Sequence, residues 1–323
     1  MQTAKDFANS NEIRWCPGCG DHAILKQFQS ALAKSGISNH KTVVVSGIGC
    51  SSRLPYYMNT YGFHTIHGRS FPIATGLKLA RPDMNVWVIT GDGDALSIGG
   101  NHYIHLFRRD IDLSILLFNN HIYGLTKGQY SPTSELGQYS KSSPSGSIES
   151  PLNALQLALT AGATFVARTF DRDAANIQGI MVDAQAHKGA ALIEILQNCP
   201  IFNDGIFDKQ IDKINQSTKT VRVKHGEPLI FGEENEKILI IDGLAPKIMD
   251  KNEVGNREIW IHDEHSQVKA HILSQLGHGN YPDFPLALGV IYRNPKNKKD
   301  ETSYMDYENS VQSIIDSGKI KEM

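Results

Sequence analysis

The chain has 323 residues, of which 40% are apolar and 20% charged, and its formal net charge is −2. This balance excludes a strong field for nucleic acid or an anionic membrane surface, so neither partner is expected. No apolar run approaches the roughly 18 residues of a membrane span, and the first six residues lack the apolar core of a signal peptide. We therefore expect a cytoplasmic protein.

Helical and strand patterns alternate along the first 200 residues. Helices are predicted where apolar residues recur every three or four positions, at residues 21–35, 71–80, 98–109, 152–161 and 172–187. Strands are predicted at short apolar runs, at residues 42–46, 86–90, 113–118, 163–167 and 190–196, the last being the final core strand. Gly36 is the expected end of the first helix. The alternation predicts an α/β fold with a doubly wound parallel sheet.

Residues 131–150 are rich in Ser, Gly and Pro and are predicted to form a long loop. A loop of this length within a compact domain is often functional. It is expected to face either a partner subunit or the substrate channel, with simple disorder as the alternative.

The pattern changes after Pro200. Residues 201–323 mix charges with short β-like segments at 238–241, 260–265 and 286–292, and the charged tail from 294 is predicted to end in a helix. We therefore expect residues 1–200 to form the α/β domain. Residues 201–323 are expected to form a C-terminal extension that covers the active site and contacts a partner.

A polar turn follows each of two consecutive predicted strands. Gly91, Asp92 and Gly93 follow the strand at 86–90, and Asn119 and Asn120 follow the strand at 113–118. Such turns meet at the carboxyl edge of a parallel sheet, where ligands bind. Carboxylate and amide oxygens suit Mg²⁺, and glycines let the backbone approach a diphosphate. The alternative is a glycine turn beside an ordinary loop.

The chain has four cysteines, and their positions suggest one cluster. Cys16 and Cys19 form a Cys-Pro-Gly-Cys turn, while Cys50 and Cys199 each follow a predicted strand. Four thiolates complete one [4Fe–4S] cluster. A Cys₄ zinc site usually pairs two Cys-x-x-Cys turns, and only one is present. Zinc and inert thiols stay open as alternatives.

Five stretches, in the same order along the chain, resemble a known enzyme family. The spacing of GDG and NN resembles the signature of thiamine-diphosphate enzymes, and the chain as a whole resembles the β subunit of a 2-oxoacid:ferredoxin oxidoreductase, most closely of the 2-oxoglutarate type. The matching stretches are residues 15–21 (WCPGCGD), 47–52 (GIGCSS), 67–82 (HGRSFPIATGLKLARP), 91–100 (GDGDALSIGG) and 120–134 (NHIYGLTKGQYSPTS). Cys199 extends the match, which is weakest after about residue 205.

The resemblance implies roles for individual residues. Asp92, Asn120 and the Ile122 carbonyl would hold Mg²⁺, which neutralises the diphosphate. The cofactor would also be bound by the turn around Gly91, by backbone N–H groups of Gly93, Asp94 and Ala95 at a helix start, and by the turn at Gly68; Asp94 is equally well explained as a carboxylate at a helix N-terminus.

Two cations are candidates for binding the substrate, and one histidine is a further catalytic candidate. Lys127 would hold the substrate carboxylate, with Arg53 as a second candidate for that role. His67 would lie near the cofactor. A solvated lysine and a structural histidine are the alternatives for Lys127 and His67.

The implied activity is the coenzyme A-dependent oxidative decarboxylation of a 2-oxoacid. Thiamine diphosphate would perform the covalent chemistry, and the [4Fe–4S] cluster would pass electrons to ferredoxin. No general base for the thiamine ring is evident, so the resemblance implies that an α subunit supplies it.

Other functions stay open at this stage. The chain could belong to a pyruvate or branched-chain 2-oxoacid enzyme, which shares most of these motifs. It could be half of a non-redox thiamine decarboxylase or synthase, or a silent scaffold that retains the fold.

Overall fold

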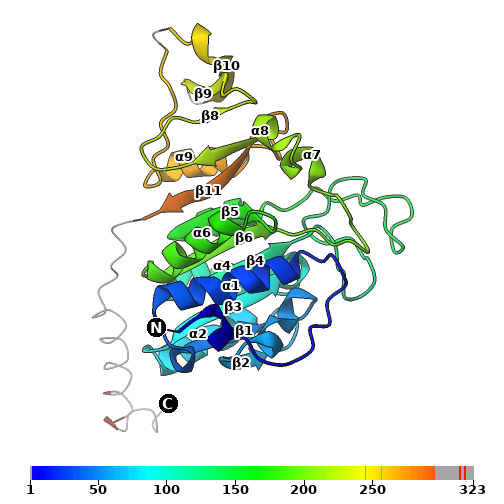
Figure 1. Ribbon diagram of the computed structural model, residues 1–323, viewed down its shortest axis with the longest axis vertical. Helices are drawn as coiled ribbons and strands as arrows, with labels where there is room; N and C mark the ends of the chain where they lie inside the picture. Colours follow the sequence, from blue (N-terminus) through cyan, green and yellow to red (C-terminus); the bar gives the residue numbers. More distant parts are fainter. Residues whose placement is uncertain (1, 244, 256, 295–312, 314–315, 318–323) are drawn as a thin grey trace.

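An eight-stranded sheet runs through the middle of the molecule (Figure 1). The computed structural model describes residues 2–243, 245–255, 257–294, 313 and 316–317. In spatial order the strands are β2 (Tyr61–His64), β1 (Thr42–Ser46), β3 (Asn85–Gly91), β4 (Leu113–Asn119), β6 (Ala190–Leu196), β5 (Phe165–Phe170), β11 (Leu286–Arg293) and β7 (Thr220–Val223).

Neighbouring strands are parallel except at one junction. β11 is antiparallel to β5, with Gly289 opposite Arg168, and β7 pairs parallel with β11. The strands from β2 to β5 therefore share one carboxyl edge, while β11 and β7 end at the opposite edge. The expectation of a doubly wound parallel sheet is confirmed for the first six strands.

Helices cover both faces of the sheet. In Figure 1, α1 (Asp21–Ser35) and α6 (Ala174–Ala186) lie side by side in front of it. The other face is covered by α2 (Ser70–Ala80), α4 (Gly100–Arg109), α5 (Ala154–Thr160) and α9 (Gln267–Leu273). Strand residues alternate between the faces: Val86 and Val88 pack beside α2 and α4, whereas Trp87 and Ile89 pack beside α1 and α6.

The remaining elements are short. A second, antiparallel sheet is formed by β8 (Ile230–Phe231), β9 (Lys237–Asp242) and β10 (Ala245–Asp250). The short helices are α3 (Asp92–Leu96), α7 (Asp208–Ile211), α8 (Gln216–Lys219), η1 (Ala4–Phe7), η2 (Asn39–Lys41), η3 (Ser51–Tyr57) and η4 (Lys251–Glu253).

Most sequence-based elements match the structure. The predictions for α1, β1 and β6 coincide with the observed bounds, and Gly36 ends α1 in the left-handed conformation, with φ of 74°. The helix predicted from residue 98 begins at Gly100, after a break at Ser97 that separates it from α3.

Two predictions about the later part of the chain were wrong. β6 is not the final strand of the core, because β11 and β7 extend the same sheet beyond β5. Residues 260–265 form no strand; Ile259 and Ile261 make only isolated bridges, because the backbone contacts there are divided between Pro228 and Ile240. The predicted C-terminal helix lies mostly outside the described residues.

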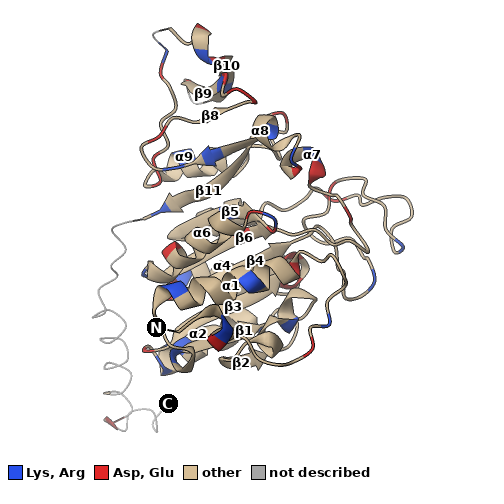
Figure 2. Ribbon diagram, in the orientation of Figure 1, with Lys and Arg blue, Asp and Glu red and all other residues tan. Residues whose placement is uncertain are grey.

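Charges of both signs are interspersed over the helices and turns in Figure 2. Within the described ranges, no helix has the length and apolar character needed to cross a membrane.

Candidate functional site

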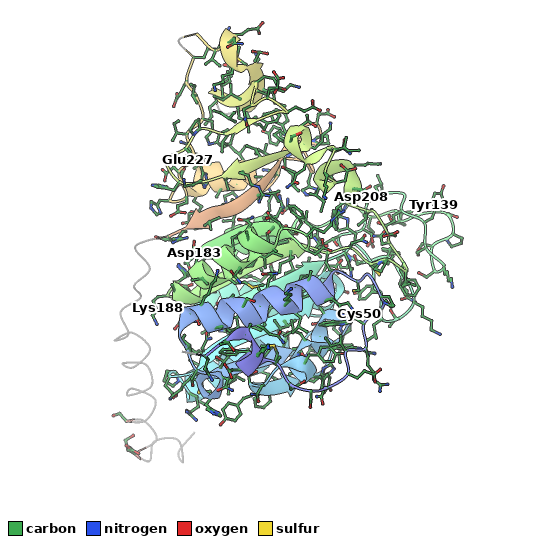
Figure 3. All side chains as sticks on the ribbon, in the orientation of Figure 1. Cys50, Tyr139, Asp183, Lys188, Asp208 and Glu227 are labelled. Atoms are coloured by element: carbon green, nitrogen blue, oxygen red, sulfur yellow. The ribbon has the colours of Figure 1, made fainter. Side chains whose placement is uncertain are left out.

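The predicted site residues follow four adjacent strands at their shared carboxyl edge. Cys50 follows β1, Asp92 follows β3, Asn120 follows β4 and Cys199 follows β6. Figure 3 shows Cys50 at this edge, on the side of the sheet where the long loop carrying Tyr139 projects. The parallel register therefore brings together residues that are far apart in the sequence.

A cavity of about 150 Å³ lies at this edge. Most of the predicted cofactor residues line it, together with Cys50. The lining residues are Asp21, Ile48, Gly49, Cys50, Ser51, His67, Gly91, Asp92, Gly93, Asp94, Phe118, Asn120, Ile122, Tyr123, Gly124, Leu125, Thr126 and Gln197. Gly68 and Ala95 are not among the lining residues; Gly68 N donates to the lining residue Asp94 (2.7 Å), and Ala95 is buried.

Asp92 is buried with one carboxylate oxygen already occupied. Its Oδ2 accepts hydrogen bonds from the hydroxyls of Ser131 (2.5 Å) and Thr133 (2.6 Å). Burial raises the pKa of Asp92 to about 6, while these two hydrogen bonds act in the opposite direction. The side chain is thus held in one orientation by two donors from the start of the 131–150 loop.

The turn after β4 is tied to the end of β6. Asn120 Oδ1 accepts a hydrogen bond from Ile122 N (3.2 Å), and Asn120 Nδ2 donates to Gln197 Oε1 (2.8 Å). One carboxylate, one amide oxygen and backbone carbonyls around this turn are the oxygen donors that Mg²⁺ prefers. The donor set therefore fits a magnesium ion held by Asp92, Asn120 and Ile122.

Asp94 joins three turns by its buried carboxylate. Its Oδ1 accepts hydrogen bonds from Ile48 N (3.1 Å), Gly68 N (2.7 Å) and His67 Nδ1 (2.6 Å), and its Oδ2 accepts one from Thr90 Oγ1 (2.7 Å). A proton on His67 Nδ1 leaves Nε2 of the neutral ring as an acceptor. The Asp94 side chain is therefore fully used in shaping the cavity wall.

Glycine is required at two places in this wall. A Cβ on Gly93 would lie 2.2 Å from the Tyr123 ring, whose hydroxyl donates to the Gly93 carbonyl (3.0 Å). A Cβ on Gly68, whose φ is +69°, would lie 2.6 Å from Gly99 N. At both positions a side chain would collide with neighbouring groups, so only glycine permits this packing of the turns.

The four cysteines gather beside this cavity. A Cβ built on Gly124 would lie 3.6 Å from Cys199 Sγ and 3.7 Å from Cys50 Sγ. Cys16 and Cys19 belong to one tight turn, in which Cys19 N donates to Cys16 O (3.1 Å). None of the four forms a disulfide.

Burial and mutual electrostatics disfavour free thiolates here. Burial raises the pKa of Cys50 to about 12, with nearby Asp21 and Cys199 adding to the effect. The pKa of Cys19 is raised for the same reasons, by burial first. A positive partner is needed to hold these sulfurs as thiolates, and the irons of a cluster supply that charge, so the donor set fits a [4Fe–4S] group.

Gln197 connects the two groups of ligands. Its Nε2 lies 3.3 Å from Cys19 Sγ as a donor, and its Oε1 accepts from Asn120 Nδ2. One amide side chain therefore contacts both the cysteine group and the predicted magnesium turn.

The two predicted substrate cations lie in different places. Arg53 lines a groove of about 400 Å³, together with Arg14 and Tyr56; this groove shares Ile48, Gly49 and Leu125 with the cofactor cavity. Lys127 is exposed, with φ of 77°, in the turn between Tyr123 and Gln129, and it lines neither cavity.

A buried polar chain supports Asp92 from inside the sheet. Arg168 Nε donates to Glu194 Oε2 (2.6 Å), and Glu194 Oε1 accepts from Asn119 Nδ2 (2.8 Å). The Thr133 hydroxyl lies 2.6 Å from Asp92 Oδ2 and 2.9 Å from Asn119 Oδ1, so its single hydrogen is shared between these two acceptors. These hydrogen bonds thus link β5, β6 and β4 to Asp92 in the predicted magnesium turn.

Sequence reasoning missed several of these residues. Ser131 and Thr133 were placed in a loop whose first residues are in fact buried against Asp92, and Gln197 was only a neighbour of Cys199. The signal was present for Ser131 and Thr133, because the SPTS stretch directly follows the glycine turn at 124–128.

Comparisons with known proteins agree with this geometry. A family model described as thiamine pyrophosphate enzyme, C-terminal TPP binding domain, matches residues 37–195. The fold and site therefore define a thiamine-diphosphate-binding protein.

Relatives narrow the class. The 2-oxoglutarate oxidoreductase subunit KorB of Mycobacterium tuberculosis is 54% identical over 262 residues, covering 81% of this chain and 70% of that protein. The 2-oxoacid:ferredoxin oxidoreductase subunit beta of Saccharolobus solfataricus is 44% identical over 208 residues, 62% of this chain and 68% of that protein.

A solved structure extends the similarity to the whole fold. The 2-oxoglutarate:ferredoxin oxidoreductase from Magnetococcus marinus, with 2-oxoglutarate, coenzyme A and succinyl-CoA bound, matches with a TM-score of 0.76 and 32% identity, covering 95% of this chain and 90% of that one. The chain belongs to the family of 2-oxoacid:ferredoxin oxidoreductase β subunits.

Proposed function

We propose that this chain acts with an α subunit to oxidise 2-oxoglutarate and passes the electrons through a [4Fe–4S] cluster to ferredoxin. The reaction converts 2-oxoglutarate and coenzyme A into succinyl-CoA, CO₂, a proton and two electrons; the C1–C2 bond breaks and a thioester forms. The observation that carries the proposal is the meeting of the magnesium turn and the four cysteines at one edge, joined by Gln197.

In this proposal the chain positions the cofactor. Thiamine diphosphate, when bound, supplies the thiazolium carbon that adds to the keto group and accepts the charge left by CO₂. Asp92, Asn120 and the Ile122 carbonyl hold Mg²⁺, and the backbone around Gly93 receives the diphosphate. Tyr123 packs against Gly93 and donates to its carbonyl, which fixes the backbone of this turn.

The cluster ligands are Cys16, Cys19, Cys50 and Cys199. Cys50 lines the cofactor cavity itself, so a cluster held by these cysteines would lie beside the cofactor. The N–H of Gln197 directed at Cys19 Sγ supplies a hydrogen bond of the kind that tunes a cluster potential.

The groove beside the cavity suits the anionic parts of the substrates. Arg53 lines it together with Arg14, whose charge is already paired with Glu12 (2.9 Å), so Arg53 is the main cation there. The lining is continuous with that of the cavity through Ile48, Gly49 and Leu125. Carboxylates and phosphates bind well to guanidinium groups. Lys127, the first candidate from the sequence, lies on the adjoining turn but lines neither cavity, so it ranks second to Arg53 here.

The α subunit completes the site. Among the described residues that line the cavity there are three aspartates but no glutamate, so the acid that activates the aminopyrimidine is assigned to the partner. This makes the chain half of an active site.

The test is iron and acid-labile sulfide analysis of the αβ enzyme purified anaerobically, with visible spectra during addition of 2-oxoacids and coenzyme A. We expect about four irons per chain, and bleaching of the cluster that requires 2-oxoglutarate and not pyruvate. Iron-free protein after verified anaerobic handling would overturn the redox function; bleaching by pyruvate instead would overturn only the substrate.

Two variants separate the sites. Asp92→Ala should lose Mg²⁺-dependent thiamine diphosphate binding and keep its iron. Cys199→Ser should lose iron while still binding the cofactor. A variant that loses both would point to misfolding, which circular dichroism detects.

A further inference from the structure

Three turns meet at the edge of the sheet opposite the cofactor cavity. His225 follows β7, Glu264 and His265 precede α9, and Arg293 ends β11. Figure 3 shows Glu227, two residues beyond His225, well separated from Cys50. The described chain therefore carries a cluster of imidazole and carboxylate groups that the proposed reaction does not use.

The side chains converge from two separate segments. His225, Glu264 and His265 each offer a ligand atom, and these atoms lie within 4.8 Å of one another. The two imidazole rings are 4.8 Å apart between centroids. Ligand atoms around a tetrahedral zinc ion lie about 3.4 Å apart, given Zn–N bonds of about 2.0–2.1 Å, so small rotations of the exposed rings close the site.

One imidazole already has the partner that metal-binding histidines usually have. His265 Nδ1 lies 2.7 Å from the Arg293 carbonyl. Because a carbonyl only accepts, Nδ1 carries the proton and Nε2 has a free lone pair for a metal. His225 Nδ1 receives a long hydrogen bond from Glu264 N (3.3 Å) and lies 3.9 Å from Asp263 Oδ1.

The backbone holds the three turns together without an ion. Gly226 N donates to His262 O (2.8 Å), and His262 N donates to Glu227 O (2.8 Å). Arg293 N donates to Glu264 O (2.7 Å). The ligands are therefore fixed to one another through main-chain bonds, so binding requires little ordering.

The charges around His225, Glu264 and His265 favour a moderate affinity for a cation. Glu264 is mostly buried and Asp263 adds a second carboxylate nearby, whereas the Arg293 guanidinium lies 3.6 Å from Glu264 Oε1. Arg293 is also held by Asp183 at 2.8 Å, which compensates part of its charge.

We propose that His225, Glu264 and His265 bind one divalent transition-metal ion of the zinc class, with water completing the coordination. Two imidazoles and one carboxylate form a zinc donor set, and imidazole disfavours Mg²⁺ and Ca²⁺. Bound there, the ion would fasten the turn after β7 to the turn before α9, beside the end of β11. Its role is to stabilise this edge of the sheet.

The experiment is equilibrium dialysis of the cluster-loaded αβ enzyme against Zn²⁺ under anaerobic conditions, with zinc and iron measured in the same sample. We expect the native enzyme to bind one zinc ion per β chain. The zinc affinity should fall at least tenfold in His225→Ala and in His265→Ala, and the iron content should stay unchanged in both. Glu227→Gln on the same turn is the matched control and should retain zinc.

Every other result contradicts the proposal. An intact enzyme that takes up no zinc has no such site. Zinc that persists in both histidine variants, or that displaces iron, lies on the cysteines instead. Because the measurement counts bound metal and not turnover, its failure is distinguishable from failure of the proposed reaction.

Discussion

At the scale of single residues, the clearest feature is a carboxylate whose two oxygens have different surroundings. Asp92 Oδ2 is occupied by the hydroxyls of Ser131 and Thr133. Hydrogen-bonded partners of metal ligands typically change metal affinity by about 10–100-fold. The two hydroxyls are therefore expected to matter although neither is a proposed ligand.

Thr133→Val should weaken Mg²⁺-dependent thiamine diphosphate binding by about tenfold, because Asp92 loses one of its two hydroxyl donors. Thr133→Ser, which keeps a hydroxyl, is the control and should bind almost normally. Isothermal titration at fixed free Mg²⁺ measures both. Equal affinity of the valine variant and the native protein would remove Thr133 from the site.

The pH dependence of cofactor binding should follow Asp92. Since protons and Mg²⁺ compete for the same carboxylate, the affinity of the metal-free protein should be constant well above the pKa of about 6 and fall below it, by about tenfold per pH unit. The Thr133 hydrogen bond lowers this pKa, so in Thr133→Val the midpoint should move to higher pH. An unmoved midpoint would mean that the diphosphate itself is titrating.

Gln197 should influence the reduction potential of the proposed cluster through its hydrogen bond to Cys19 Sγ. Gln197→Met keeps the approximate size of the side chain but removes the N–H directed at Cys19 Sγ. Hydrogen bonds to cluster sulfurs help set the potential, and their loss should make it more negative. Anaerobic redox titration followed by EPR tests this, with iron content as the control; an unchanged potential in an iron-replete variant contradicts it.

At the scale of elements, the Arg168–Glu194 pair crosslinks β5 and β6 in the interior of the sheet. Both side chains are almost fully buried, and Arg168 N–H also reaches the Ser274 carbonyl (3.3 Å). The Arg168 charge and hydrogen bond lower the pKa of Glu194 despite its burial, which acts oppositely. The carboxylate is therefore ionised in the fold.

Glu194→Gln should destabilise the protein by about 3–5 kcal/mol, because it leaves a buried guanidinium without its counter-charge. The double variant Arg168→Met/Glu194→Leu, which removes both charges, should be markedly more stable than the single one. Thermal unfolding followed by circular dichroism compares the three proteins. Equal midpoints for the single variant and the native protein would show that the pair is not needed.

At the scale of the whole molecule, the sequence predicted the interior far better than the edges. β1 is a run of valines flanked by Thr42 and Ser46, and β6 is apolar except for Glu194; both strands are buried along their length, so their pattern alone identifies them. β2 has four exposed residues and no alternation, so only its pairing with β1 defines it. The sequence indicated a helix start at Gly93–Ala95 but not that α3 is separate from the following helix, because the break falls at Ser97, which is neither glycine nor proline.

The candidate site followed the same rule. Residues in turns directly after buried strands were predicted, because a parallel sheet places them at one edge. Ser131, Thr133 and Gln197 were not, since their roles depend on side-chain contacts that no periodicity reveals. The pairing of β11 and β7 with the sheet could not be predicted either, because the sequence of a short strand does not identify the strand it pairs with.

A chain ending at residue 200 should therefore fail to fold independently. Without β11 the β5 edge at Val166, Ala167 and Arg168 loses its partner strand, and an unpaired edge promotes aggregation. Size-exclusion chromatography of the fragment and of the full chain tests this. A monomeric fragment with native-like circular dichroism would instead support residues 1–200 as a self-sufficient domain.

The position of β6 has a consequence for biosynthesis. β6 leaves the ribosome after β4 and β5, yet in the finished sheet it lies between them. A nascent chain that stops short of it cannot join its two halves, and it also lacks Gln197 and Cys199, which β6 carries at its end. Insertion of β6 between β4 and β5 therefore also brings the last of the four cysteines to the shared edge, so the proposed cluster site is complete only once these two parts of the sheet have joined.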